Sequence, residues 1–138
     1  FTAPRSFRLP RQAARALAED SVYRYQIQTS SLNAAAAQLS GGHQQRLVVS
    51  RELQASPHLI IAHDPTRGLD IRAARFVRER LIEQCRAGAG VILFSSEWTE
   101  LFLLCHRIAV LYRGEIVETR PVEEWTVQDL GLAMAGAL

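Results

Sequence analysis

Helix-forming residues dominate the first part of the chain, and short apolar runs typical of strands appear in the second. Three segments before residue 57 combine helix-forming residues with start or stop signals: residues 11–19 after Pro10, residues 33–38, and a helix that has Ser40 as its N-cap and ends near Gln54. We therefore predict that residues 1–56 are mainly helical.

The second part begins at Pro57 and alternates between strand and helix patterns. Residues 58–62 (HLIIA) and 91–95 (VILFS) are short apolar runs bounded by turn signals, which is typical of fully buried strands. Between them, Asp70 is a good N-cap for a helix over residues 71–86. That helix has a predicted apolar face, formed by Ile71, Ala74, Val77, Leu81 and Cys85. A strand, a helix and a strand in this order predict a right-handed crossover and a parallel strand pair.

Shorter elements complete the second part. We predict a helix over residues 97–105, a hairpin that turns at Arg113 and Gly114, and a last helix over residues 127–134. The hairpin is expected at the edge of the parallel sheet. The predicted fold class is therefore α/β over residues 57–138, with a parallel sheet core and an edge hairpin, preceded by the helical part.

Composition narrows the class of protein. Of the 138 residues, 48% are hydrophobic and 22% are charged, which indicates a soluble, globular chain. There is no apolar run of about 18 residues, so no segment is predicted to span a membrane. Cys85 and Cys105 have no CxxC spacing, and we expect each to be a small buried hydrophobe in a reducing compartment, not part of a disulfide or a metal site.

The basic residues give only a weak indication of nucleic-acid binding. All 16 are arginines, and the formal net charge is only +2. Arg8, Arg11 and Arg15 have the spacing of one helix face, but no aromatic residues interleave them as a base-stacking surface would require. A solvated helix face is the favoured interpretation.

The stretch LSGGH, residues 39–43, is the first candidate for chemistry. Ser40 caps a helix whose first residues are Gly41 and Gly42, so backbone N–H groups and a hydroxyl point outward at the positive end of the helix dipole. Glycine allows a phosphate to come close to the backbone. The segment is therefore a candidate anion site.

The order of the motifs is more specific than any one of them. LSGGHQQ, an apolar strand, DPTRGLD, a helix, a strand ending in SSE and an RGEIV hairpin resemble the second half of an ATP-binding cassette (ABC) ATPase, a P-loop NTPase fold. The resemblance covers about residues 25–136. More narrowly, LSGGxQQ, PTRGLD and SSE resemble the C-terminal cassette of the fused, two-cassette ATPases of simple-sugar importers, and LGLAMAG resembles a branch linked to nucleosides.

The resemblance implies a role for each matching residue. The signature residues Leu39, Ser40, Gly41, Gly42 and His43 would contact ATP held by the opposite cassette, with His43 standing where the family usually has Gln or Asn. Gly68, Leu69 and Asp70 look like the loop that crosses the cassette interface, the D-loop. The implied cofactors are ATP and Mg²⁺.

The sequence departs from the family at the positions that act on the chain's own nucleotide. The family has an Asp–Glu pair before PT, in which Asp helps to hold Mg²⁺ and Glu polarises water, but here the pair is His63 and Asp64. A neutral imidazole is a poor ligand for Mg²⁺, and Asp is one methylene shorter than Glu. Ser96 replaces the switch histidine of the family and has no cationic form. We predict a degenerate half-site.

The phosphate-cradling motif GxxxxGK[ST] does not occur in the sequence, which contains no lysine. Because the first residue is Phe1 and not Met, we expect this chain to be part of a longer protein, with the cradle upstream. The chain alone is predicted to be inactive. The implied partners are a second cassette, membrane permease subunits and an extracytoplasmic substrate-binding protein, at the cytoplasmic face of the membrane, and no nucleic acid is expected.

Alternative functions stay open from the sequence. The altered His63, Asp64 and Ser96 favour a non-catalytic regulatory or structural relic of the ATPase fold, whereas the intact LSGG opposes it. The arginines allow an ABC ATPase that acts on nucleic acid or ribosomes, but SSE and LGLAMAG point to transport. A Ser-His-Asp hydrolase is disfavoured, because there is no GxSxG elbow and adjacent residues of an extended chain point in different directions.

Overall fold

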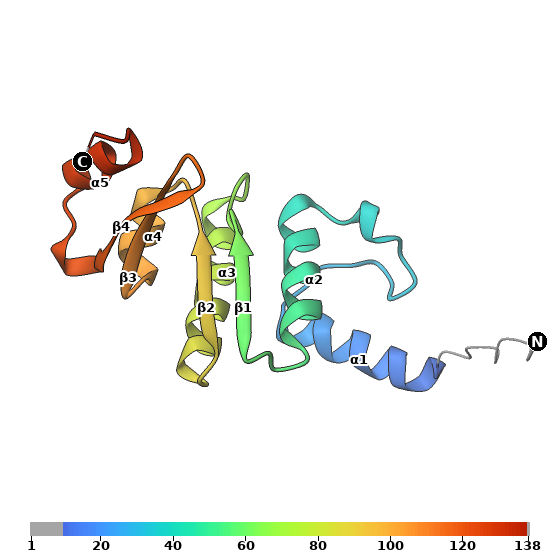
Figure 1. Ribbon diagram of the computed structural model, residues 1–138. Helices are drawn as coiled ribbons and strands as arrows, with labels where there is room; N and C mark the ends of the chain where they lie inside the picture. The colour runs from blue at the N-terminus through green and yellow to red at the C-terminus, as the bar shows by residue number, and fades with distance from the viewer. Residues whose placement is uncertain (1–9, 138) are drawn as a thin grey trace, which may run out of the picture. The chain divides into compact units, whose positions relative to one another are not determined.

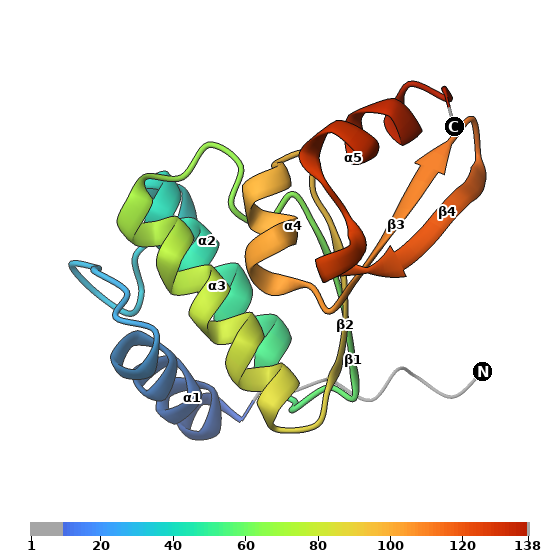
Figure 2. The ribbon, with the colours of Figure 1, turned by 90° about the vertical axis from the view of Figure 1, so that its left-hand side faces the viewer.

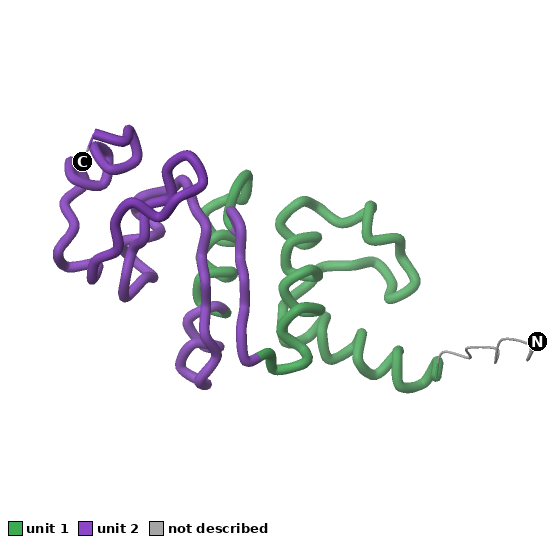
Figure 3. The backbone as a smooth tube through the Cα atoms, viewed as in Figure 1, with its two compact units in different colours: residues 1–57, 66–80 green, residues 58–65, 81–138 purple. Residues whose placement is uncertain are grey.

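The computed structural model describes residues 10–137, so Arg8 of the predicted basic face lies outside the described residues. Helices and strands follow one another along the chain as Figure 1 shows. The chain divides into two compact units (Figure 3): unit 1 holds Phe1–Pro57 and Thr66–Arg80, and unit 2 holds His58–Pro65 and Leu81–Leu138. Among the described helices, none is long and apolar enough to cross a bilayer.

Unit 1 is helical. It contains α1 (Arg11–Arg24), the short 3-10 helix η1 (Ala36–Gln38), α2 (Gly41–Leu53) and most of α3 (Ile71–Arg86). The helix α1 continues to Arg24, beyond the predicted end at Glu19, and ion pairs one turn apart join Arg15 to Glu19 and Arg24 to Asp20 on its exposed surface.

The segment before the signature is less helical than predicted. Only Ala36–Gln38 of the predicted helix over residues 33–38 is helical. Two local hydrogen bonds take the place of helical ones here. The Asn33 N–H donates to Ser31 Oγ, and the Ala34 N–H donates to the Ser31 carbonyl. Local hydrogen bonds of this kind favour turns over helix.

The buried face of α3 is rotated from the predicted one. Ala74, Val77 and Leu81 are buried as expected, but Ile71 is 85% exposed and Cys85 is also exposed. The buried stripe is centred on Val77, at 1% exposure, and includes Ala73 and Phe76. Six residues at about 100° each place Ile71 some 120° away from Val77 around the helix, outside that stripe. The prediction that Cys85 is a buried hydrophobe is wrong, because this residue is exposed.

Unit 2 contains the parallel strand pair. β1 (Leu59–His63) pairs with β2 (Gly90–Phe94) in a register that sets Leu59 opposite Gly90 and His63 opposite Phe94. The prediction of fully buried strands is wrong: alternate residues of the pair share one exposed face, which is formed by Leu59, Ile61, His63, Gly90, Ile92 and Phe94, and the residues between them are half-buried. An apolar run is compatible with burial of both faces of a strand pair, but a face is buried only where another element packs against it.

The rest of unit 2 has its own core. The helix α4 (Trp98–Leu104) leads into a hairpin of β3 (Arg107–Tyr112) and β4 (Glu115–Pro121), and the 3-10 helix η2 (Val122–Glu124) and α5 (Val127–Met134) follow. The buried residues Ile108, Val110, Trp125, Leu130 and Ala133 pack together, with α4 against them (Figure 2). Within the described residues, the hairpin forms a separate sheet and does not extend the parallel pair.

Candidate functional site

The signature lies at the start of α2. Ser40 is the N-cap in an extended conformation and is exposed, and its side chain makes no capping hydrogen bond to its own helix. A β-carbon placed on Gly41 would have no neighbour within 4 Å, whereas one on Gly42 would lie 3.2 Å from Ala73 Cβ in α3. The hydroxyl and the first backbone N–H groups of a thirteen-residue helix are thus open to an anion.

His43 faces its own chain. Its Nδ1 accepts a hydrogen bond of 3.1 Å from the Gln28 backbone N–H, and the residue is half-buried. This hydrogen bond joins the start of α2 to the segment that precedes it.

Arg46 is a residue that the sequence reasoning missed. Its Nη1 donates to the Tyr25 carbonyl over 3.1 Å, and its guanidinium carbon lies 4.1 Å from the centre of the Phe76 ring. A planar guanidinium can stack on an aromatic face and donate along its edge at the same time. No local pattern in the sequence marks this residue, because its partners Tyr25 and Phe76 lie far from it along the chain. Arg46 fixes α2 against both the turn at Tyr25 and α3.

The predicted D-loop precedes α3. Gly68 has φ +72°, and the Leu69 N–H donates to the Thr66 carbonyl over 3.2 Å. Asp70 Oδ1 accepts from the Ala73 N–H over 2.8 Å, which confirms the predicted N-cap. Since Ala73 is also the neighbour of Gly42, the structure brings the first turn of α3 to the first turn of α2.

The residues of the predicted half-site, His63, Asp64 and Ser96, lie at the end of β1 and in the loop after β2. The His63 side chain is 79% exposed and that of Asp64 is 17% exposed, with His63 Nε2 3.9 Å from Asp64 Oδ2. Asp64 Oδ1 accepts a hydrogen bond of 3.3 Å from the Ser96 backbone N–H. Asp64 and Ser96 are therefore hydrogen-bonded to each other, and the exposed His63 side chain lies beside Asp64.

Ser95 and Glu100 form a second contact that the sequence reasoning missed. Ser95 Oγ donates to Glu100 Oε2 over 2.9 Å and accepts from the Glu97 N–H over 3.1 Å. Glu100 is only 2% exposed. The sign of this contact in the sequence is that Glu100 is the single acidic residue within the largely apolar stretch TELFLL. Burial, and then the nearby charge of Glu100, raise the pKa of the Cys105 thiol.

The half-site residues do not fit a magnesium site. No group of three or more His, Cys, Asp or Glu side chains within residues 10–137 is placed to hold a metal ion. Mg²⁺ requires oxygen ligands, and His63 offers an imidazole, so Asp64 is the one carboxylate among the three predicted half-site residues. The start of α2, in contrast, has the donors that a phosphate requires.

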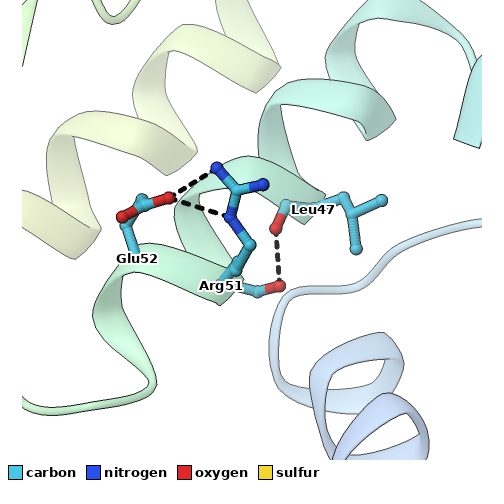
Figure 4. Close-up of polar contacts among 4 residues, drawn as sticks. Leu47, Arg51 and Glu52 are labelled. Carbon is cyan, nitrogen blue, oxygen red and sulfur yellow. Dashed lines mark hydrogen bonds and ion pairs between the residues drawn. The ribbon is translucent and has the colours of Figure 1, made fainter. Parts of the chain in front are cut away.

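A cavity of about 650 Å³ lies in unit 1 between α1, α2 and the segment that joins them. Leu47, Ser50 and Arg51 of α2 are among its lining residues. The hydroxyl of Ser50 is used locally, since it donates to the Leu47 carbonyl over 2.8 Å (Figure 4). The lining of the cavity is mostly apolar, which distinguishes it from the exposed hydroxyl and backbone N–H groups at the start of α2.

Solved structures define the class of fold. The ATP-binding cassette MJ0796, in a dimeric post-hydrolysis state bound to ADP and Pi, matches 88% of this chain and 52% of its own with a TM-score of 0.71 at 23% identity. An ATP-binding subunit of an ABC transporter matches 91% of this chain and 60% of its own with a TM-score of 0.73 at 21% identity. The fold is that of an ABC cassette, as the motif order predicted.

Sequence relatives define the family, although no family model matches the chain. The guanosine import ATP-binding protein NupO of Bacillus subtilis is 43% identical over 120 residues, which are 87% of this chain and 24% of that protein. The glucose import ATP-binding protein TsgD13 of Haloferax volcanii is 39% identical over 104 residues, 75% of this chain and 19% of that protein. The chain belongs to the ABC ATPase family, and it spans about a quarter or less of the length of these relatives.

Proposed function

We propose that the chain is part of the C-terminal cassette of an ATP-driven importer of simple sugars or nucleosides. It supplies the LSGG signature to ATP bound in the partner cassette, while its own half-site binds nucleotide loosely or hydrolyses it slowly. One site of the pair hydrolyses ATP and the other holds it.

The start of α2 carries this proposal. Ser40 is exposed and does not cap its own helix, and Gly41 has open space around it, so both are available to the terminal phosphate of a bound ATP. Leu39, Gly42 and His43 support the same turn from within unit 1. Gly68, Leu69 and Asp70 form the D-loop that meets the partner cassette.

The end of β1 supports the asymmetry. His63, at the position where the family holds Mg²⁺, presents an exposed imidazole, and Ser96 offers no cation to stabilise a transferring phosphoryl group. Asp64 stands where the family has its water-polarising Glu, and its carboxylate is one methylene shorter and accepts from the Ser96 N–H through Oδ1. Phosphoryl transfer depends on positioning to within about 1 Å, so these replacements would slow the reaction at this half-site.

The family and the names of the relatives support the wider assignment. Residues 1–56 would be part of the helical subdomain and residues 57–138 the C-terminal part of the α/β subdomain. The other cassette, permease subunits and an extracytoplasmic binding protein would be the partners, at the cytoplasmic face of the membrane. The import names of relatives such as NupO and TsgD13 support a nucleoside or sugar as the substrate.

The test compares Ser40→Ala with Asp64→Asn in the complete two-cassette protein. Removing the Ser40 hydroxyl is expected to lower steady-state ATP hydrolysis about 100-fold, by analogy with the loss of one donor to a transition state. Asp64→Asn is expected to leave hydrolysis within about twofold, because this half-site contributes little turnover. Equal losses from both changes would exclude the asymmetric mechanism.

A further inference from the structure

The backbone of Asp64 is held in an uncommon conformation at the end of β1. Its φ is +43°, a left-handed value, and it directly precedes Pro65, which is buried. Asp and Asn tolerate this region better than other residues with a β-carbon, but the conformation persists only where the surroundings enforce it. Here the Asp64 N–H donates to the Phe94 carbonyl over 2.8 Å, at the end of the neighbouring strand.

The side chain of Asp64 reaches the same neighbour two residues further on. Its Oδ1 accepts from the Ser96 N–H over 3.3 Å, and only 17% of the side chain is exposed. Main chain and side chain of one residue thus hold Phe94 and Ser96, on either side of Ser95. A hydrogen bond to a partly shielded carboxylate competes less with water than one on the open surface.

The loop is held from its other side by Ser95. The Ser95 hydroxyl donates to the buried Glu100 and accepts from the Glu97 N–H, and the Glu100 N–H donates back to the Glu97 carbonyl over 3.0 Å. Residues 95–97 therefore have hydrogen bonds to Asp64, which directly follows β1, and to Glu100 of α4. These hydrogen bonds hold the loop in one conformation.

We propose that Asp64 is a positioning residue: its carboxylate oxygen holds the main chain of Ser96 in place, and it is the acceptor geometry of the side chain, not proton transfer, that this position requires. The functional meaning rests on the function proposed above, in which this half-site holds nucleotide without rapid turnover. The contact itself does not depend on that function.

The test uses three substitutions and hydrogen exchange measured by mass spectrometry on the complete protein without nucleotide. Asp64→Asn keeps an oxygen acceptor and the tolerance of a left-handed backbone but removes the charge. Asp64→Ala removes the acceptor. Asp64→Gly removes the acceptor too but relieves the backbone strain, so it separates the two effects.

In Asp64→Ala and in Asp64→Gly, the peptide that contains Ser96 is expected to exchange about tenfold faster, with peptides from β3 and α5 unchanged, as loss of one hydrogen bond implies. Asp64→Asn is expected to restore exchange to within about twofold of the parent. Unchanged exchange in Asp64→Ala, or equally fast exchange in Asp64→Asn, would overturn the proposal. This readout needs no ATP hydrolysis, so it can succeed or fail independently of the proposed function.

The same variants separate a positioning role from a catalytic one. If Asp64→Asn abolished hydrolysis while leaving the exchange of the Ser96 peptide unchanged, Asp64 would act on water, and the claim that this position requires only acceptor geometry would be wrong. If Asp64→Asn kept nucleotide affinity and Asp64→Ala weakened it several-fold, the loop geometry would be the property that matters.

Discussion

The guanidinium of Arg46 lies 4.1 Å from the centre of the Phe76 ring, and its Nη1 donates to the Tyr25 carbonyl. One side chain thus joins the signature helix to α3 and to the turn after α1. Arg46→Lys keeps the charge but removes the planar group, so we expect the free energy of unfolding to fall by about 1–3 kcal/mol in chemical denaturation.

Arg51→Lys is the matched control for this measurement. Arg51 is on the same helix but is exposed, and its Nη2 pairs with Glu52 Oε1 at 2.6 Å (Figure 4). Exposed ion pairs contribute little, so the free energy of unfolding should change by less than about 0.5 kcal/mol. Equal effects of the two substitutions would mean that the Phe76 contact does not stabilise unit 1.

The two signature glycines are expected to respond differently to alanine. Gly41→Ala has open space and a more favourable helix propensity, so the free energy of unfolding should stay constant or rise by up to about 1 kcal/mol. Gly42→Ala would place its β-carbon 3.2 Å from Ala73 Cβ and should be less stable than Gly41→Ala by about 1–2 kcal/mol. Adding Ala73→Gly to Gly42→Ala should restore the lost stability, because it removes the β-carbon that the new side chain meets. Thermal unfolding of the parent, of the two single glycine variants and of this double variant measures the difference.

The last turn of the chain depends on a glycine. Gly136 has φ +71°, and a β-carbon there would lie 2.5 Å from the Tyr112 ring. Gly136→Ala should lower the free energy of unfolding by about 2–4 kcal/mol, through backbone strain and steric overlap together.

Gly88→Ala isolates the strain, because Gly88 has φ +99° and a β-carbon added there would have no neighbour within 4 Å. Its cost should be about 1–2 kcal/mol in urea denaturation. If Gly88→Ala were as costly as Gly136→Ala, the Tyr112 contact would not explain the requirement for glycine.

The two cysteines should differ in reactivity. Burial and the charge of Glu100 raise the pKa of the Cys105 thiol, so at pH 8 a smaller fraction is thiolate, while Cys85 is exposed. Alkylation by iodoacetamide, followed by mass spectrometry, should be on the order of tenfold slower at Cys105. Glu100→Gln should speed it modestly by removing the charge, and a denaturant should bring the two rates together. Equal rates in the native protein would contradict this burial.

Local signals predicted most elements of the fold. Ser40 and Asp70 mark the starts of α2 and α3: Ser40 occupies the N-cap position without a side-chain hydrogen bond, and Asp70 caps α3 with one. The apolar runs predicted β1 and β2 to within one residue, and the motif order predicted the ABC cassette fold that the solved structures confirm. These signals succeed because caps, turns and apolar runs act over a few residues.

Burial and contacts were decided by the tertiary structure. The sequence determined that Ile71, Cys85 and the strand residues are apolar, but packing left Ile71, Cys85 and one strand face exposed. The sequence also identified Asp64 and Ser96 separately by their motif positions. Their contact, and those of Arg46 with Phe76 and Ser95 with Glu100, join residues on different elements or turns. Residue type and spacing set what a side chain can do, whereas its partner is chosen by how the elements pack, which no local pattern encodes.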